Sequence, residues 1–211
     1  MTRVKICGIS RTDDGLAALE AGADLLGFVF YPPSHRYISA SQARQIVSRC
    51  RERIPDGWQA VGVFVNVPID RVNETVESAG LDLVQLAGDE GPQYCAAVAR
   101  PVVKVVRVDA RGIPIGPTNA AAWNAERILL DSHRPGRYGG TGQAYDWASV
   151  RPYAGRALLA GGLSPANVGE ALRLARPWGL DASSGVERDR RKDPGLIRQF
   201  LAEVKAHDGA R

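Results

Sequence analysis

The stretch "AGADLLGFVF", residues 21–30, decides the fold prediction. A helix-like segment ends on an alanine and a glycine, and an aliphatic run begins two residues later. "AGLDLVQL", residues 79–86, repeats the arrangement further along the chain. A glycine that ends a helix just before an apolar run is typical of the short helix-to-strand loops of α/β proteins. The sequence therefore predicts helices and strands that alternate.

Eight short aliphatic or β-branched runs recur at similar intervals. They are "VKIC" (4–7), "LLGFVF" (25–30), "AVGVFV" (60–65), "LDLVQL" (81–86), "VVKVVRV" (102–108), "RILLD" (127–131), "ALLAGG" (157–162) and "WGLDAS" (178–183). Helix-like stretches lie between them, including 11–23, 39–50, 68–80 and 164–175. Eight strand–helix pairs in 211 residues, about 26 residues each, fall near the lower size limit of a (β/α)₈ barrel. An open doubly wound sheet is the main alternative. The count of eight and the lack of a linker favour a single TIM-barrel domain spanning 1–211.

The mild positive charge of the chain fits a small anionic substrate at least as well as a nucleic acid. The net charge is +4 and the isoelectric point is near 9.1, but the cations are scattered along the chain. The basic runs "RCRER" (49–53) and "RDRRK" (188–192) are short and typical of solvated surface, and basic stripes interleaved with aromatics are missing. We therefore expect no nucleic-acid partner.

Cysteine usage indicates a reducing compartment. Cys7, Cys50 and Cys95 are far apart, odd in number, and form no Cys-x-x-Cys pair. We expect free thiols in a cytoplasmic protein, with no metal site built on cysteine. No export segment precedes the first run, and no apolar run approaches the roughly 18 residues of a membrane span. Neither export nor membrane insertion is expected.

Cys7 is the first candidate for chemistry. In a strand over 4–7, Val4 and Ile6 share one face while Lys5 and Cys7 share the other. A lone strand cysteine is usually core, but this one ends its strand just before a glycine, where TIM barrels carry their active sites. Lys5 on the same face favours a thiolate, so we expect the pKa of Cys7 to fall below about 8.5. Cys50 and Cys95 lie in helical segments and are taken as structural.

Asp131 ends the run "RILLD" and is the second candidate. A strand-terminal aspartate is often a helix cap, but here a long glycine-containing loop follows instead of a helix. A thiol and a carboxyl that project from two strands into one barrel mouth can serve as base and acid for moving a proton on carbon.

Three glycine-containing turns indicate a phosphorylated ligand. They are "GGTG" (139–142), "AGGLSPANV" (160–168) and "DASSGVE" (181–187), of which the last two follow the seventh and eighth strands. TIM barrels commonly bind phosphate at that location on backbone N–H groups. "GGTG" fits neither the Rossmann nor the Walker pattern, so no dinucleotide or nucleoside triphosphate is expected.

Arg36, in the proline-rich loop 31–39, offers a planar guanidinium suited to a carboxylate. His35 and His133 also lie on loops at that end of the barrel. They lack metal-ligand spacing, so we assign them no role and expect no metal.

These strings together resemble a known family. "KICGISRTDDGLAALEAGADLLGFVFYPPSHRYIS" (5–39) closely resembles the N-terminal signature of the phosphoribosylanthranilate isomerases of tryptophan biosynthesis. "LLDSHRPGRYGGTGQAYDW" (129–147), "LAGGLSPANV" (159–168) and "DASSGVE" (181–187) are similar to later motifs of that family, in the same order and spacing. The resemblance spans the whole chain.

The resemblance implies an aldose–ketose isomerase on a TIM barrel. It implies a cofactor-free Amadori rearrangement of N-(5-phospho-β-D-ribosyl)anthranilate to 1-(2-carboxyphenylamino)-1-deoxy-D-ribulose 5-phosphate. In the matching positions, Cys7 is the implied general base and Asp131 the implied general acid. Arg36 is implied to lie near the anthranilate carboxylate and Asp181 near the sugar. The implied phosphate site consists of Gly161, Gly162, Ser183 and Ser184. The oligomeric state is left open.

Some positions depart from the family pattern. Ala87 stands where the family usually has histidine, Ala182 replaces a common valine, and "RRKD" (190–193) lacks the usual glycine before Lys-Asp. Two alternative functions are considered beside this one. A bifunctional histidine/tryptophan phosphosugar isomerase is disfavoured because resembling enzymes carry aspartate at the position of Cys7. A non-catalytic barrel that only binds a phosphorylated ligand would not need both Cys7 and Asp131.

Overall fold

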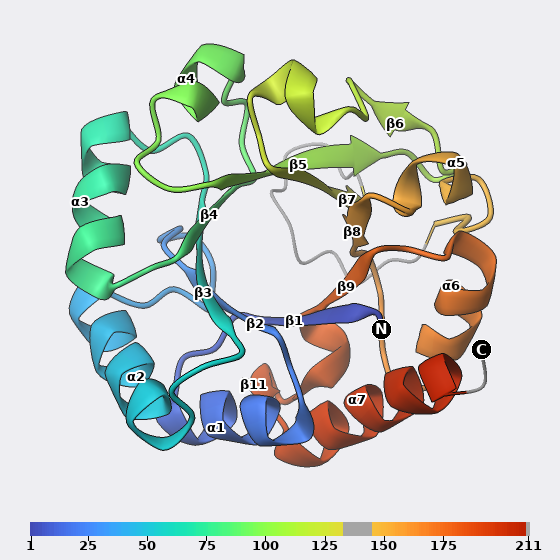
Figure 1. Ribbon diagram of the computed structural model, residues 1–211, viewed down its shortest axis with the longest axis horizontal. Coiled ribbons are helices and arrows are strands. Elements are labelled where there is room, and N and C mark those ends of the chain that lie inside the picture. The colour runs from blue at the N-terminus through green and yellow to red at the C-terminus, as the bar shows by residue number, and fades with distance from the viewer. Residues whose placement is uncertain (133–144, 210–211) are drawn as a thin grey trace.

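The computed structural model describes residues 1–132 and 145–209 and forms a closed barrel of parallel strands surrounded by helices (Figure 1). The barrel strands are β1 (Arg3–Cys7), β2 (Leu25–Val29), β3 (Gln59–Phe64), β4 (Leu83–Leu86), β5 (Val102–Val108), β7 (Arg127–Ser132), β8 (Ala157–Leu159) and β9 (Gly179–Ala182). They pair in the order β4-β3-β2-β1-β9-β8-β7-β5, and β4 also pairs with β5. This last pairing closes the ring, so the open-sheet alternative is excluded. The predicted eight-stranded TIM barrel is confirmed, and each predicted apolar run forms one of its strands.

The outer ring contains the predicted helices. The described helices are α1 (Thr12–Ala21), α2 (Ala40–Arg53), α3 (Ile69–Ala79), α4 (Pro92–Ala96), α5 (Arg151–Ala154), α6 (Val168–Ala175) and α7 (Pro194–Gly209), with 3₁₀ turns η1 (Ala120–Trp123) and η2 (Ser184–Val186). Gly22 and Gly80 end α1 and α3 in the left-handed conformation, with φ of 100° and 70°. A residue without Cβ adopts this conformation without strain, which is why these two glycines terminate helices before strands.

One side of the ring departs from the regular strand–helix repeat. Between β5 and β7 the chain forms β6 (Pro114–Ile115), antiparallel to β5, and then η1 instead of an α-helix. The following α5 has only four residues. Gly112, Pro114, Gly116 and Pro117 crowd this segment, and these residue types disfavour continuous helix. The prediction of eight regular strand–helix pairs is therefore wrong here, although all eight strands form.

The barrel interior is apolar where the strands begin and polar where they end. Leu25, Val61 and Leu83 pack together inside the lower barrel, and a second interior cluster follows with Val103, Leu129, Leu158 and Ala160. Lys5 of β1 lies beside Leu25 and beside Asp181 of β9 in strand register, so charge enters the interior at the level of Leu25. Because the lower interior is filled, the chemistry of the barrel is confined to the carboxyl ends of its strands.

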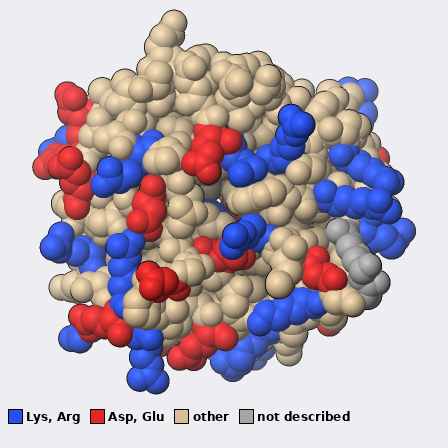
Figure 2. All heavy atoms as spheres, viewed as in Figure 1, with Lys and Arg blue, Asp and Glu red and all other residues tan. Residues whose placement is uncertain are grey.

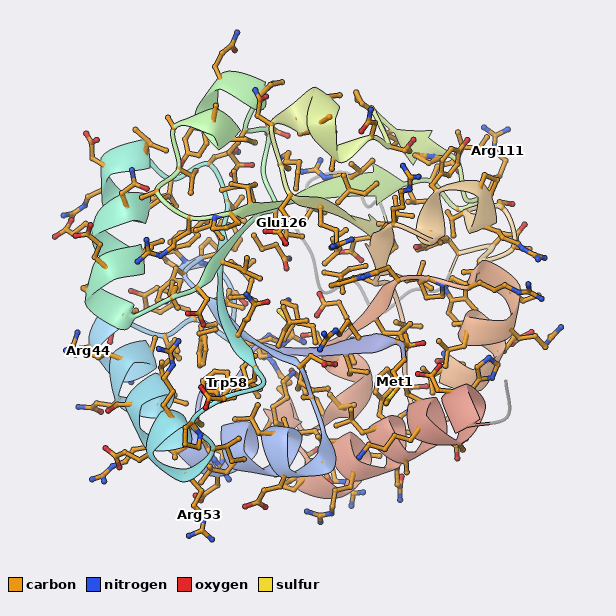
Figure 3. The ribbon with its side chains drawn as sticks, viewed as in Figure 1. Met1, Arg44, Arg53, Trp58, Arg111 and Glu126 are labelled. Atoms are coloured by element: carbon orange, nitrogen blue, oxygen red, sulfur yellow. The ribbon has the colours of Figure 1, made fainter. Side chains whose placement is uncertain are left out.

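Figures 1–3 view the barrel from the end at which its strands begin. Figure 3 labels Met1, which precedes β1, and Glu126, which precedes β7. Positive and negative side chains are interspersed over the left and lower parts of this face, whereas its top is largely uncharged (Figure 2). None of the helices in the described ranges is long and apolar enough to cross a membrane.

Candidate active site

A pocket at the carboxyl ends of the strands brings together every site residue that the sequence predicts. It encloses about 980 Å³ of empty space, which includes its open mouth. Its lining includes Cys7, Arg36, Asp131, Gly161, Gly162, Asp181, Ser183 and Ser184, which come from positions spread over most of the chain. The shared location of these residues does not test the role predicted for each one, and those roles remain predictions.

Cys7 lies above a buried ion pair. Lys5 Nζ donates to Asp181 Oδ1 at 3.0 Å, and both side chains are almost fully buried. Gly27 of β2 leaves the space for this arrangement, since a Cβ there would lie 2.9 Å from Cys7 Sγ and 3.0 Å from Lys5 Nζ. The thiol and the ammonium therefore border the same small space, as the shared strand face of Lys5 and Cys7 predicts.

The pKa of Cys7 differs from the sequence-based expectation. Burial of the thiol raises its pKa above the ordinary 9.0, the charge of Lys5 opposes this, and the net shift is upward. The expected pKa below about 8.5 is therefore wrong for the free protein. The strand pattern places Lys5 near Cys7, but it does not show that the thiol is buried. Burial away from water disfavours the charged thiolate.

Asp131 has the properties of a carboxyl that can hold its proton. Burial raises its pKa to about 6, and the nearby Asp181 carboxylate contributes in the same direction. Asp131 Oδ1 accepts a hydrogen bond of 2.8 Å from the backbone N–H of Ser132, which favours the charged form and limits the shift. A carboxyl with a pKa near 6 is suited to general acid catalysis near neutral pH.

The predicted phosphate-binding residues line one side of the pocket after β8 and β9. Gly161 and Gly162 have φ of 95° and 68°, a backbone conformation that only glycine adopts freely. Ser183 Oγ donates to the backbone oxygen of Cys7 at 3.1 Å, which joins this loop to the end of β1. Backbone N–H groups of glycine-containing turns can approach a phosphate closely because no side chain intervenes.

Arg36 is held by a residue to which the sequence analysis assigns no role. Its Nε and Nη2 donate to the two carboxylate oxygens of Glu187 at 2.6 and 2.8 Å. Lys192 Nζ donates to Glu187 Oε1 at 2.6 Å as well. Lys192 is only 6% exposed, so the interpretation of 188–192 as solvated surface is wrong for its last residue. The partner of Lys192, Glu187, is only five positions away, but Glu187 also binds Arg36, 151 positions away, and no local pattern shows that meeting.

Three further pocket residues were not assigned a role from sequence. Gln85 of β4 is 5% exposed, and its Oε1 has no hydrogen-bond partner among the described residues. Arg107 of β5 lies beside Asp131 in strand register and 3.6 Å from Asp89. Ala87, two residues after Gln85, lines the same pocket. Alternation along β5, where Val103, Val105 and Arg107 share a face, was the signal available for Arg107.

The remaining candidates contribute less. His35 Nε2 lies 3.6 Å from Glu187 Oε2, and burial together with Arg36 lowers the pKa of His35. His133 and "GGTG" (139–142) lie outside the described residues. Cys50 and Cys95 are buried in α2 and α4, as predicted. Across 1–132 and 145–209, no group of three or more His, Cys, Asp or Glu side chains is arranged to hold a metal ion.

Comparison with known proteins identifies the family. The model of the family described as N-(5'-phosphoribosyl)anthranilate (PRA) isomerase matches residues 4–203. The chain belongs to this family. The N-(5'-phosphoribosyl)anthranilate isomerase of Citrifermentans bemidjiense is 46% identical over 208 residues, covering 97% of this chain and 98% of the relative. That of Pseudomonas fluorescens is 43% identical over 210 residues, covering 99% and 98%.

Solved isomerases of the family share the architecture. Phosphoribosyl anthranilate isomerase from Thermus thermophilus superposes with a TM-score of 0.83 at 37% identity, covering 97% of this chain and 99% of that one. A second solved isomerase, in complex with reduced 1-(o-carboxyphenylamino)-1-deoxyribulose 5-phosphate, gives 0.77 at 35% identity, covering 98% and 100%. The family and the barrel predicted from sequence are both confirmed.

Proposed function

We propose that this isomerase converts N-(5-phospho-β-D-ribosyl)anthranilate to 1-(2-carboxyphenylamino)-1-deoxy-D-ribulose 5-phosphate in tryptophan biosynthesis. The family match over residues 4–203 supports the reaction. Among the site observations, the one that carries the assignment is the pairing of Cys7 with Asp131, a carboxyl whose pKa is raised to about 6, around one pocket. The rearrangement needs one group that gives a proton and one that takes a proton from carbon.

In the proposed mechanism, Asp131 in its acid form donates a proton to the furanose ring oxygen. The bond between C1′ and that oxygen breaks while the nitrogen lone pair forms the C1′=N bond. Cys7 as thiolate then removes the proton from C2′, and the C–H electron pair forms the C1′=C2′ bond of an enolamine as the iminium nitrogen regains its lone pair. A proton added at C1′ and loss of the C2′ hydroxyl proton give the ketone. No atom is gained or lost, so the balance needs no oxidant, reductant or cofactor.

The other predicted residues bind the substrate in this proposal. Arg36 holds the anthranilate carboxylate, because a guanidinium matches the geometry of a carboxylate. Asp181 lies on the Lys5 side of the pocket and orients the sugar. The phosphate binds at Gly161, Gly162, Ser183 and Ser184. We further propose that residues 1–211 act as one cytoplasmic domain on this small carboxylated phosphosugar, without nucleic-acid or membrane partners.

A direct assay tests the function. Purified protein is mixed with freshly formed phosphoribosylanthranilate, the loss of its fluorescence is followed, and chromatography identifies the ketose product. We expect wild type to consume the substrate, and the matched control Cys7→Ser to consume it at least about 10²-fold more slowly. Binding of a phosphorylated product analogue without turnover would instead indicate a non-catalytic barrel. Equal turnover of the histidine-pathway aminoaldose would indicate the bifunctional isomerase.

A further inference from the structure

Arg36 belongs to a buried cluster of three charged side chains, and the other two have no role in the proposed reaction. Glu187 lies at its centre and accepts from Nε and Nη2 of Arg36 and from Nζ of Lys192. The side chains of Arg36, Glu187 and Lys192 are 11%, 7% and 1% exposed. The cluster joins the loop after β2 to β10 (Glu187–Arg188) and β11 (Arg191–Lys192), which form a small antiparallel hairpin after β9.

We propose that Glu187 and Lys192 are positioning residues for substrate binding, which hold Arg36 ready for the anthranilate carboxylate and tie that subsite to the phosphate loop. The inference rests on the proposed function, because Arg36 is a carboxylate ligand only in that proposal. Neither residue is assigned a substrate contact of its own.

The geometry of Arg36 supports fixation in one orientation. A Cβ on Gly8 would collide with Arg36 Cδ, so the arginine stem lies directly against the backbone that follows β1. On the other side, the Nε and Nη2 edge is bound by both oxygens of Glu187. A guanidinium held through two parallel bonds cannot rotate out of its plane without breaking both. The Nη1 edge is not used by Glu187, and Arg36 lines the pocket.

The charge of the cluster explains the presence of Lys192. Hydrogen bonds and charges of Arg36 and Lys192 outweigh burial and lower the pKa of Glu187 to about 2, so this carboxylate is ionised at neutral pH. Glu187 alone would neutralise Arg36 and remove its attraction for an anion. The second cation gives the cluster a net charge of +1. The arginine is thereby fixed without losing the positive potential that a carboxylate ligand requires.

Lys192 also links the two anion subsites. Its Nζ donates to the backbone oxygen of Ser183 at 2.9 Å, in the predicted phosphate loop. Ser183 Oγ in turn donates to the backbone oxygen of Cys7. One network therefore connects the carboxylate subsite, the phosphate subsite and the strand that carries the base. Removal of Lys192 should therefore weaken binding of both the carboxylate and the phosphate of the substrate.

Kinetics of substituted proteins test the proposal. We expect Glu187→Gln and Lys192→Met each to raise KM at least about tenfold while kcat stays within about threefold. The reason is that the contact between Arg36 and the anthranilate carboxylate is present in both the ground state and the transition state. Arg188→Ala is the matched control. Arg188 lies on the same hairpin, is exposed, and contacts Asp193 instead of the cluster. Arg188→Ala should therefore leave KM and kcat unchanged.

A double-mutant cycle separates positioning from general damage. If Glu187 acts through Arg36, Glu187→Gln should add little to the KM of Arg36→Ala, and the two effects should not be additive. As a binding probe, reduced 1-(o-carboxyphenylamino)-1-deoxyribulose 5-phosphate is compared with the same compound lacking the carboxyl group. Wild type should prefer the carboxylated compound, and Glu187→Gln should lose most of that preference.

Several outcomes overturn the inference while leaving the proposed function intact. They are an unchanged KM in both variants, full additivity with Arg36→Ala, or equal loss of affinity for both probes. Should Glu187→Gln fail to fold, Glu187→Asp keeps the charge but shortens the reach, and it carries the same expectation with a smaller effect. Absence of isomerase activity in wild type would instead refute the proposed function.

Discussion

Asp181 Oδ1 accepts a hydrogen bond of 3.0 Å from Lys5 Nζ, and this ion pair lies within the barrel below Cys7. Its two side chains are 1% and 8% exposed. Burial lowers the pKa of Lys5, but the charges of Asp181 and Cys7 outweigh burial and the net shift is upward, so the ammonium stays charged. Lys5 therefore supplies a permanent positive charge beside the thiol, while Asp181 makes burial of that charge tolerable.

Lys5→Met tests both consequences of this pair. Loss of the ammonium leaves Asp181 buried without its partner, so we expect the protein to lose about 3–5 kcal/mol of stability in urea titrations. The pKa of Cys7 should rise further, because the charge that lowers it is gone. Iodoacetamide labelling across a pH series, mapped by mass spectrometry, measures this rise. Cys50 serves as internal control, since its pKa of about 11 results from burial alone. An unchanged labelling profile for Cys7 would contradict the role of Lys5.

Cys7→Ser and Asp131→Asn should each lower kcat by at least about 10²-fold, because each removes one proton-transfer group. Both substitutions conserve size, so far-UV circular dichroism and the melting temperature should stay near those of wild type. Cys50→Ser, at a buried cysteine of α2 that does not line the pocket, is the control for loss of a thiol. Full activity of either active-site variant would refute the assigned acid and base.

The pH dependence of kcat/KM follows from two shifted pKa values. The active form needs Asp131 protonated and Cys7 ionised, yet Asp131 has a pKa of about 6 and that of Cys7 lies above 9.0. Because the pKa of Cys7 lies above that of Asp131, only a small fraction of molecules is in the active form, and this fraction is constant between the two pKa values. We expect a bell with a broad plateau, an acidic limb near pH 6 and a basic limb above pH 9. A profile that rises through pH 6–9 without a plateau would contradict this order of pKa values.

Acid stability should depend on Glu187. Its pKa in the folded protein is about 2, below the ordinary 4.5, so it contributes stability above pH 4.5 that is lost as the pH falls through 2. The shift of about 2.5 units corresponds to at most about 3 kcal/mol. Urea titrations of wild type from pH 5 to pH 2 should show this decline, and Glu187→Gln should show a flatter curve over the same window. Parallel curves would mean that the cluster contributes no pH-dependent stability.

The sequence by itself determined the barrel strands and most of the pocket. The eight apolar runs are local signals, because strand alternation and helix-ending residues such as Gly22 and Gly80 act over a few positions. The rule that barrel chemistry lies at strand carboxyl ends then sufficed to select Cys7 and Asp131. The segment between β5 and β7 was predicted less well. Its glycines and prolines exclude a long helix, but they do not specify that β6 pairs with β5.

Only the tertiary structure decided the electrostatics of the site. The pKa of Cys7 depends on how completely the barrel removes water from the thiol, and Lys5 at close range did not reverse that effect. Lys192 belongs to a basic run typical of surface, yet it is buried against Glu187. Arg36 and Glu187 are 151 positions apart in sequence. Burial and charge pairing are sums over neighbours from distant segments, and those neighbours are defined only once the ring of strands has closed.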